Sequence, residues 1–262
     1  MTMLRGLSVL LAAAMAAGCG DDGAAVMDAG SGSDSSPRDT GGGGVDSGPG
    51  TDSGPGVDSG PALDAGGGEA DAGPRSMLSF FITSTPLDGG DLGGLAGADT
   101  HCQSLAEAVG AGDRTWRAYL SASDGGDGSP VHARDRIGAG PWLNAAGTMI
   151  ASDVDDLHAD NDISKENGLT ENGDEVPGRG DTPNQHDILT GSTDEGMLFA
   201  GETCDDWTSN GGGDSARVGH HDKVGPCATC TSWNSAHNSA GCSMSDLIGT
   251  GGNGFFYCFA AD

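Results

Sequence analysis

The sequence predicts a loop-rich α+β domain that is stapled by disulfides and follows a disordered tether. Six of the seven cysteines lie between Cys102 and Cys258, and six cysteines in an exported domain are typical of a disulfide framework. One early segment has helical periodicity, and several short β-rich runs follow it between stretches of Gly, Asn, Asp and Ser. This order favours α+β over the alternating units of a parallel sheet.

The N-terminal segment indicates export and a lipid anchor. Residues 1–18 contain Arg5, an apolar stretch from Leu7 to Ala17 and small residues directly before Cys19. The apolar stretch is too short for a membrane span, which needs roughly 20 residues. The pattern resembles a bacterial lipoprotein signal peptide, which implies lipidation of Cys19; an ordinary cleaved signal peptide is the alternative. We therefore expect a lipid-anchored protein of the bacterial cell envelope, and favour the outer membrane or cell surface over the inner membrane.

Residues 19–75 read as a disordered tether rich in Gly, Ser, Asp and Pro. An imperfect six-residue repeat begins at Val45 with the sequence Val-Asp-Ser-Gly-Pro-Gly. Such a composition cannot bury enough apolar surface to offset the entropy of ordering the chain. The tether is interpreted either as a spacer that holds the domain away from the membrane or as a repeat expansion without a selected length.

The remaining residues, 76–262, are enough for one domain. A β-branched and aromatic run predicts a strand over 79–85, and residues 98–109 place Ala98, Cys102, Leu105, Ala106 and Val109 on one helical face. We expect Asp99 to cap this helix and Gly110 to end it. Residues 122–187 are expected to be mostly loop. Further strands or extended segments are expected at 116–120, 142–143, 148–151, 188–191, 204–209, 215–219 and 255–260.

The charge of the domain excludes several classes of partner. It has 28 acidic and 8 basic residues, a net charge of −20. Nucleic acids, heparin-like polyanions and anionic lipid surfaces need clustered Lys and Arg, so we expect none of them as a ligand. The acidic excess suits metal cations or neutral sugars, although solubility alone is the preferred explanation. The sequence has neither a Gly-x-Ser-x-Gly elbow nor a phosphate loop, and we do not expect an enzyme.

Several segments in order along the domain carry a resemblance to a known family. They are Ser79–Ser121, Ala133–Arg136, Leu189–Gly196, Glu202–Thr208, Cys242 and Phe256–Phe259. These segments are similar to endostatin, a collagen fragment with a C-type-lectin-like fold. The similarity spans the domain, with insertions at about 152–187 and 211–241. The chain also looks like bacterial lipoproteins that carry an endostatin-like domain of unknown function after such a tether.

The resemblance implies a disulfide pairing, although six cysteines by themselves allow 15. It implies that Cys102 joins Cys258 and that Cys204 joins Cys242, which leaves Cys227 and Cys230 for each other. Two properties of endostatin do not carry over. The first is the zinc site of endostatin: Ser79 stands where its strand histidine would be, and only Asp135 matches. The second is the arginine-rich heparan-sulfate surface of endostatin, which a domain of net charge −20 lacks.

One candidate zinc cluster has histidines and cysteines at metal-like spacing. It consists of His220, His221, Cys227 and Cys230. The oxidising export route argues against this reading, because a Cys-x-x-Cys pair can instead close a small disulfide.

A candidate calcium loop offers carboxylate oxygens at alternating positions. Its residues are Asp153, Asp155, Asp156, Asp160 and Asp162. The preferred interpretation is a solvated acidic loop, so we expect no cofactor, with calcium as the alternative.

Trp233 and Asn234 are the candidate ligand-binding residues. The fold would place them near the long-loop face, where an exposed aromatic ring can stack on a sugar or contact a protein. Trp207 is expected in the core, and Trp233 is expected to be the more open of the two. We therefore predict a non-catalytic lectin-like module that binds carbohydrate or protein at the cell surface. The alternatives are a metal-binding protein or metal-dependent enzyme, and a structural envelope protein.

Overall fold

One long strand, β8 (Gly252–Ala260), organises the fold in the computed structural model. Two antiparallel neighbours flank its second half, β1 (Phe80–Ile82) on one edge and β2 (Trp116–Ala118) on the other. Its first half pairs in parallel with β5 (Asp187–Leu189). The structure describes residues 76–262, and the predicted signal peptide, Cys19 and the tether lie outside them.

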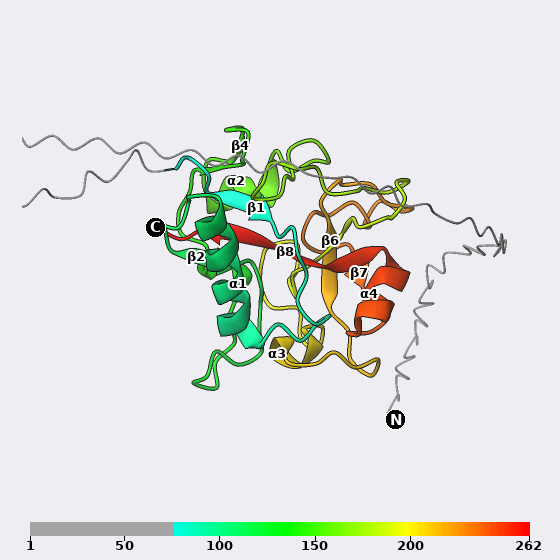
Figure 1. Ribbon diagram of the computed structural model, residues 1–262. Coiled ribbons are helices and arrows are strands. Elements are labelled where there is room, and N and C mark those ends of the chain that lie inside the picture. The colour runs from blue at the N-terminus through cyan, green and yellow to red at the C-terminus, as the bar shows by residue number, and fades with distance from the viewer. Residues whose placement is uncertain (1–75) are drawn as a thin grey trace, which may run out of the picture. The chain divides into compact units, whose positions relative to one another are not determined.

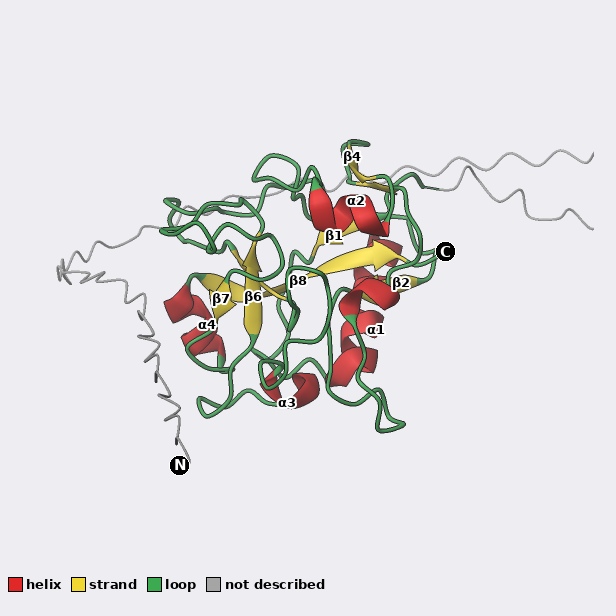
Figure 2. Ribbon diagram, turned by 180° about the vertical axis from the view of Figure 1, so that it is seen from behind, coloured by secondary structure: helices red, strands yellow, loops and turns green. Residues whose placement is uncertain are grey.

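The sheet continues beyond β5 with two further antiparallel strands. These are β6 (Arg217–His220) and β7 (His237–Asn238), and the order across the sheet is β1-β8-β5-β6-β7. Both ribbon views place α1 (Gly94–Ala108) near one end of β8 and α4 (Met244–Thr250) near its other end (Figures 1 and 2). The remaining elements are η1 (Ala133–Asp135), β3 (Trp142–Leu143), β4 (Met149–Ala151), α2 (Val154–Ala159) and α3 (Cys204–Trp207).

Both faces of β8 are buried. Successive side chains of a strand point to opposite sides, and on each side of β8 they pack into a different hydrophobic cluster. Phe256 and Cys258 pack in the cluster that contains the buried face of α1. Tyr257 and Phe259 pack in a second cluster on the opposite face, together with Trp142 and residues of α2. The domain is therefore a mixed α+β fold with two cores that share one central strand. No helix within residues 76–262 has the length and apolar character that a membrane span requires.

Three disulfides connect the elements. They join Cys102 to Cys258, Cys204 to Cys242, and Cys227 to Cys230, which are the pairs that the resemblance implies. The first ties α1 to the central strand β8, and both of its cysteines are fully buried. The helical face containing Ala98, Cys102 and Ala106 is buried as the periodicity predicts.

Several local expectations are wrong. Asp99 does not cap α1, because the helix already begins at Gly94; its carboxylate accepts a hydrogen bond from the Ala118 backbone and pairs with Arg136 at 2.8 Å. The strand expected at 204–209 is instead the turn α3, whose four residues all have positive φ between 48° and 67°. The helices α2 and α4 and the short strand β7 are not among the elements predicted from the sequence.

Candidate functional site

A polar pocket opens between the end of α2 and the loop that follows β6. Its volume is about 410 Å³, within the range of roughly 300–1,000 Å³ typical of small-ligand sites. Trp233 and Asn234, the two candidate ligand-binding residues, both line it. The other lining residues are His158, Ala159, Asn161, Asp194, Lys223, Ala228, Thr229, Thr231 and Ser232.

A chain of hydrogen bonds fixes one side of the pocket. The Asn234 side-chain amide donates to the Tyr119 hydroxyl at 2.9 Å, and this hydroxyl lies 2.7 Å from His158 Nε2. His158 Nδ1 lies 2.7 Å from the Val154 carbonyl, which can only accept, so Nδ1 carries the proton and Nε2 accepts from Tyr119. Burial lowers the pKa of His158 and raises the pKa of Tyr119, so both groups are neutral at pH 7.

Trp233 forms a wall of the pocket rather than an exposed platform. Only 5% of its surface is accessible; it is more open than Trp207, as expected, but it is not the exposed aromatic ring that sugar stacking would use. Its ring packs against Tyr119 at 4.9 Å and Tyr257 at 5.3 Å between centroids, and its carbonyl accepts a hydrogen bond from the Tyr257 hydroxyl. Trp207 is fully buried, as expected. Trp233 therefore shapes the pocket and can offer only a small part of its surface to a ligand.

The charges of the pocket lining are few. Lys223 donates to the Asn161 carbonyl at 2.7 Å, and burial lowers the pKa of its ammonium group. Asp194 is the one acidic residue of the lining. Hydroxyl and amide groups provide most of the remaining polar surface, an arrangement that suits a ligand with many hydroxyl or amide groups.

No family model and no curated protein matches this chain. What the site can bind is therefore inferred from its own lining residues.

In residues 76–262, the carboxylates of the acidic segment are not brought together as a group that could share one ion. Asp153 caps α2 by accepting hydrogen bonds from the backbone of Asp155 and Asp156. Asp156 accepts from the backbone and hydroxyl of Ser152, Asp155 pairs with Arg134, and Asp162 accepts from Asn167. Asp160 follows the helix end. Within residues 76–262, the one group of three or more ligand side chains that can reach a common ion lies elsewhere, at His186, Asp187 and His220.

The predicted His/Cys zinc cluster is also not assembled. Cys227 and Cys230 are joined to each other, so neither offers a thiolate. His221 Nε2 faces the Pro177 carbonyl at 3.4 Å, and burial lowers the pKa of this imidazole to about 4. His220 alone belongs to a group of potential ligands, and its companions are different residues from those expected.

Sequence reasoning missed His186, Asp187 and His237, which lie near His220 in space. They are far apart along the chain, and only the pairing of β5, β6 and β7 brings them together. One signal was available in the sequence. Four of the seven histidines fall between residues 186 and 237.

Proposed function

We propose that this protein is a lipid-anchored lipoprotein of the bacterial cell envelope whose C-type-lectin-like domain binds carbohydrate or protein without catalysis. The observation that carries the binding proposal is the polar pocket next to α2, which contains Trp233 and Asn234. Its size and its hydroxyl and amide lining favour one or two sugar units as the occupant.

The endostatin-like assignment is supported by the arrangement of the domain. The first and last strands, β1 and β8, are neighbours, and a disulfide joins the early helix to β8. A second disulfide fixes the turn that contains Trp207.

Blocking the pocket is expected to abolish ligand binding. Ala228 is exposed and lines the pocket, so Ala228→Trp adds an indole to the cavity without disturbing the core. We expect at least a tenfold loss of affinity for any glycan that the full chain retains on a glycan array, measured by calorimetry. Stability should change by less than about 0.5 kcal/mol, as for other surface substitutions.

Ala108→Trp is the matched control, because Ala108 is an exposed alanine at the end of α1 and is not part of the pocket lining. It should leave glycan binding unchanged. Equal binding by the Ala228→Trp variant and the wild-type chain would place the glycan elsewhere. A chain that retains no glycan would favour a protein partner or a purely structural role.

The anchor is tested separately. Cys19→Ser is expected to move the protein from the membrane fraction to the soluble fraction, because each buried CH₂ of an acyl chain contributes about 0.8 kcal/mol to membrane binding. Fractionation with mass spectrometry of the N-terminal peptide measures the change, and Ser33→Ala in the tether is the control. A Cys19→Ser chain that stays on the membrane would refute the lipoprotein assignment.

A further inference from the structure

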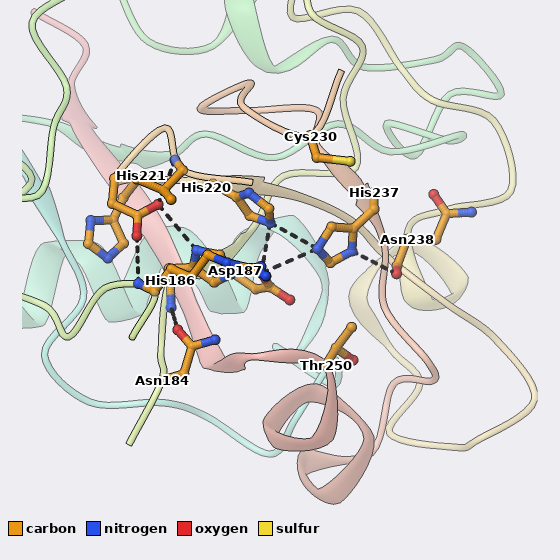
Figure 3. Close-up of polar contacts among 12 residues, drawn as sticks. Asn184, His186, Asp187, His220, His221, Cys230, His237, Asn238 and Thr250 are labelled. Carbon is orange, nitrogen blue, oxygen red and sulfur yellow. Dashed lines mark hydrogen bonds and ion pairs between the residues drawn. The ribbon is translucent and has the colours of Figure 1, made fainter. Parts of the chain in front are cut away.

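Three histidines surround the carboxylate of Asp187 where β5, β6 and β7 meet (Figure 3). His186 directly precedes β5 and Asp187 begins it, His220 ends β6, and His237 begins β7. The strand register pairs Asp187 with His220 and Val218 with His237, which brings residues from three separate segments to one place.

The ligand atoms of His186, Asp187 and His220 all lie within 4.8 Å of one another, and His237 lies close to Asp187 and His220. Asp187 Oδ1 lies 3.2 Å from His186 Nε2, 3.1 Å from His220 Nε2 and 3.5 Å from His237 Nε2. The Nε2 atoms of His220 and His237 are 2.9 Å apart. Zinc bonds of about 2.0–2.2 Å place the ligands of a tetrahedral ion about 3.3–3.6 Å from one another. Small shifts of His186, Asp187 and His220 would therefore accommodate an ion, and His237 would complete its coordination by turning toward the other three.

Two of the imidazoles are held with a lone pair facing the cluster. His186 Nδ1 lies 3.2 Å from Asp222 Oδ1, and His237 Nδ1 lies 3.0 Å from the Asn238 carbonyl. Each Nδ1–H group donates a hydrogen bond to its acceptor, so Nε2 of the neutral ring carries no proton and offers its lone pair. A carboxylate or carbonyl on the far nitrogen is the arrangement that orients histidine ligands at metal sites. Asp222 is itself fixed by the backbone of Arg179 and Val224.

The Asp187 carboxylate is buried, and the polar groups nearest to its Oδ1 are the Nε2 atoms of the three histidines. Its side chain is 3% exposed, and neither oxygen has a hydrogen bond despite the three nearby nitrogens. His220 Nδ1 is also buried without a hydrogen bond. Burying a carboxylate without well-formed hydrogen bonds is costly, and the rings of His186 and His220 stack beside it at 3.9 Å between centroids. A bound cation would lower this cost, because it would bind the carboxylate oxygen and the imidazole nitrogens that face it together.

We propose that these side chains form a binding site for one divalent transition-metal ion, with zinc as the best match. The ligands are His186, Asp187, His220 and His237. Three imidazole nitrogens with one carboxylate oxygen suit zinc, whereas calcium takes six to eight oxygens. His186, Asp187 and His220 form the buried part of the site, and His237, whose side chain is 31% exposed, closes it on the solvent side.

The ion links three strands and does not need a substrate pocket. Four protein donors fill a tetrahedral zinc, which is the composition of a structural site. None of the four ligands lines the polar pocket, so the two sites are separate.

Zinc titration of the full chain, stripped with a chelator, tests the site directly. We expect one zinc ion per chain by calorimetry, with all six domain cysteines still oxidised in a thiol assay. At free zinc of 100 times the Kd, Tm should rise by about 5–10 °C, because linkage gives about 2.7 kcal/mol and each kcal/mol shifts Tm by about 2–4 °C in a domain of this size. Calcium at the same concentration should not shift Tm.

His237→Ala is the sharpest variant because the side chain is partly exposed and its loss leaves the core intact. It should weaken zinc binding at least 100-fold, and Asp222→Asn should weaken it about 10–100-fold by releasing His186. His101→Gln, in α1, is the control and should bind zinc like the wild-type chain.

Cobalt provides a readout that needs no variant. The cobalt-loaded wild-type chain should show the intense visible absorption of a four-coordinate ion. An absorption of octahedral intensity, no zinc uptake by the folded wild-type chain, or equal zinc affinity of the His237→Ala and His101→Gln variants would each overturn the proposal.

Discussion

Removing the disulfide between Cys102 and Cys258 is expected to destabilise the domain by about 5 kcal/mol, because it closes a loop of 156 residues. That is a large part of the roughly 5–15 kcal/mol by which a typical domain is stable. The pair Cys102→Ala and Cys258→Ala also leaves a cavity between α1 and β8, since both sulfurs are fully buried. Chemical denaturation followed by circular dichroism measures the loss, and Tm should fall by about 10–20 °C.

The small disulfide between Cys227 and Cys230 is the internal control. Its sequence separation is 3, so Cys227→Ala with Cys230→Ala should cost only about 1.5 kcal/mol by the same loop-closure relation. Equal losses for the two double variants would contradict the role assigned to the longer bridge.

Gly219→Ala is expected to destabilise the domain by about 3 kcal/mol, at the upper end for steric overpacking. A Cβ at position 219 would lie 1.8 Å from the Trp233 carbonyl oxygen and 2.2 Å from its carbon. The loop that contains Trp233 cannot move away from β6 easily. The Ser232 carbonyl accepts a hydrogen bond from the His220 N–H, and the Ala236 N–H donates one to the Val218 carbonyl. Relieving the clash would break these bonds, each contributing about 0.5–1.5 kcal/mol.

Gly249→Ala provides the contrast for this prediction. Gly249 lies in α4, and a Cβ there meets nothing within 4 Å. The substitution should stabilise the domain by about 0.5–1 kcal/mol, because alanine has the higher helix propensity. Urea denaturation of both variants measures the difference. A Gly219→Ala domain as stable as the wild type would show that the backbone at Trp233 does not pack directly against β6.

Local sequence patterns predicted the elements in which buried apolar residues recur at helical spacing or in a continuous run. The helical spacing of Ala98, Cys102 and Ala106 identified the buried face of α1, and the apolar run near residues 255–260 identified β8. Two helix starts were readable in the sequence, although neither helix was predicted. Ser243 caps α4 with Asp246 in the third position after it, and Asp153 caps α2, although it was read as a calcium ligand.

Other features depend on tertiary structure and leave no local signal. The left-handed turn of α3 costs roughly 1–2 kcal/mol per residue, so no propensity favours it at Cys204 to Trp207. It is held from outside by the bridge to Cys242 and by the Trp207 indole, which donates to the Ser121 carbonyl. The metal ligands are likewise brought together only by long-range strand pairing. Residue type pointed correctly to His220, but only the sheet register identifies the residues around it.

The nested order of the three disulfides has a consequence for how the chain matures. β8 follows every other element of the domain, and it supplies Cys258, the partner of the earliest domain cysteine. During the proposed export, Cys102 emerges long before Cys258, and an oxidase acting on cysteines in order of appearance would join Cys102 to Cys204. That bond is absent from the native set, so it must be reshuffled before the sheet can close. Production of the folded protein should therefore depend on a disulfide isomerase in the compartment that receives it, and not on oxidation alone.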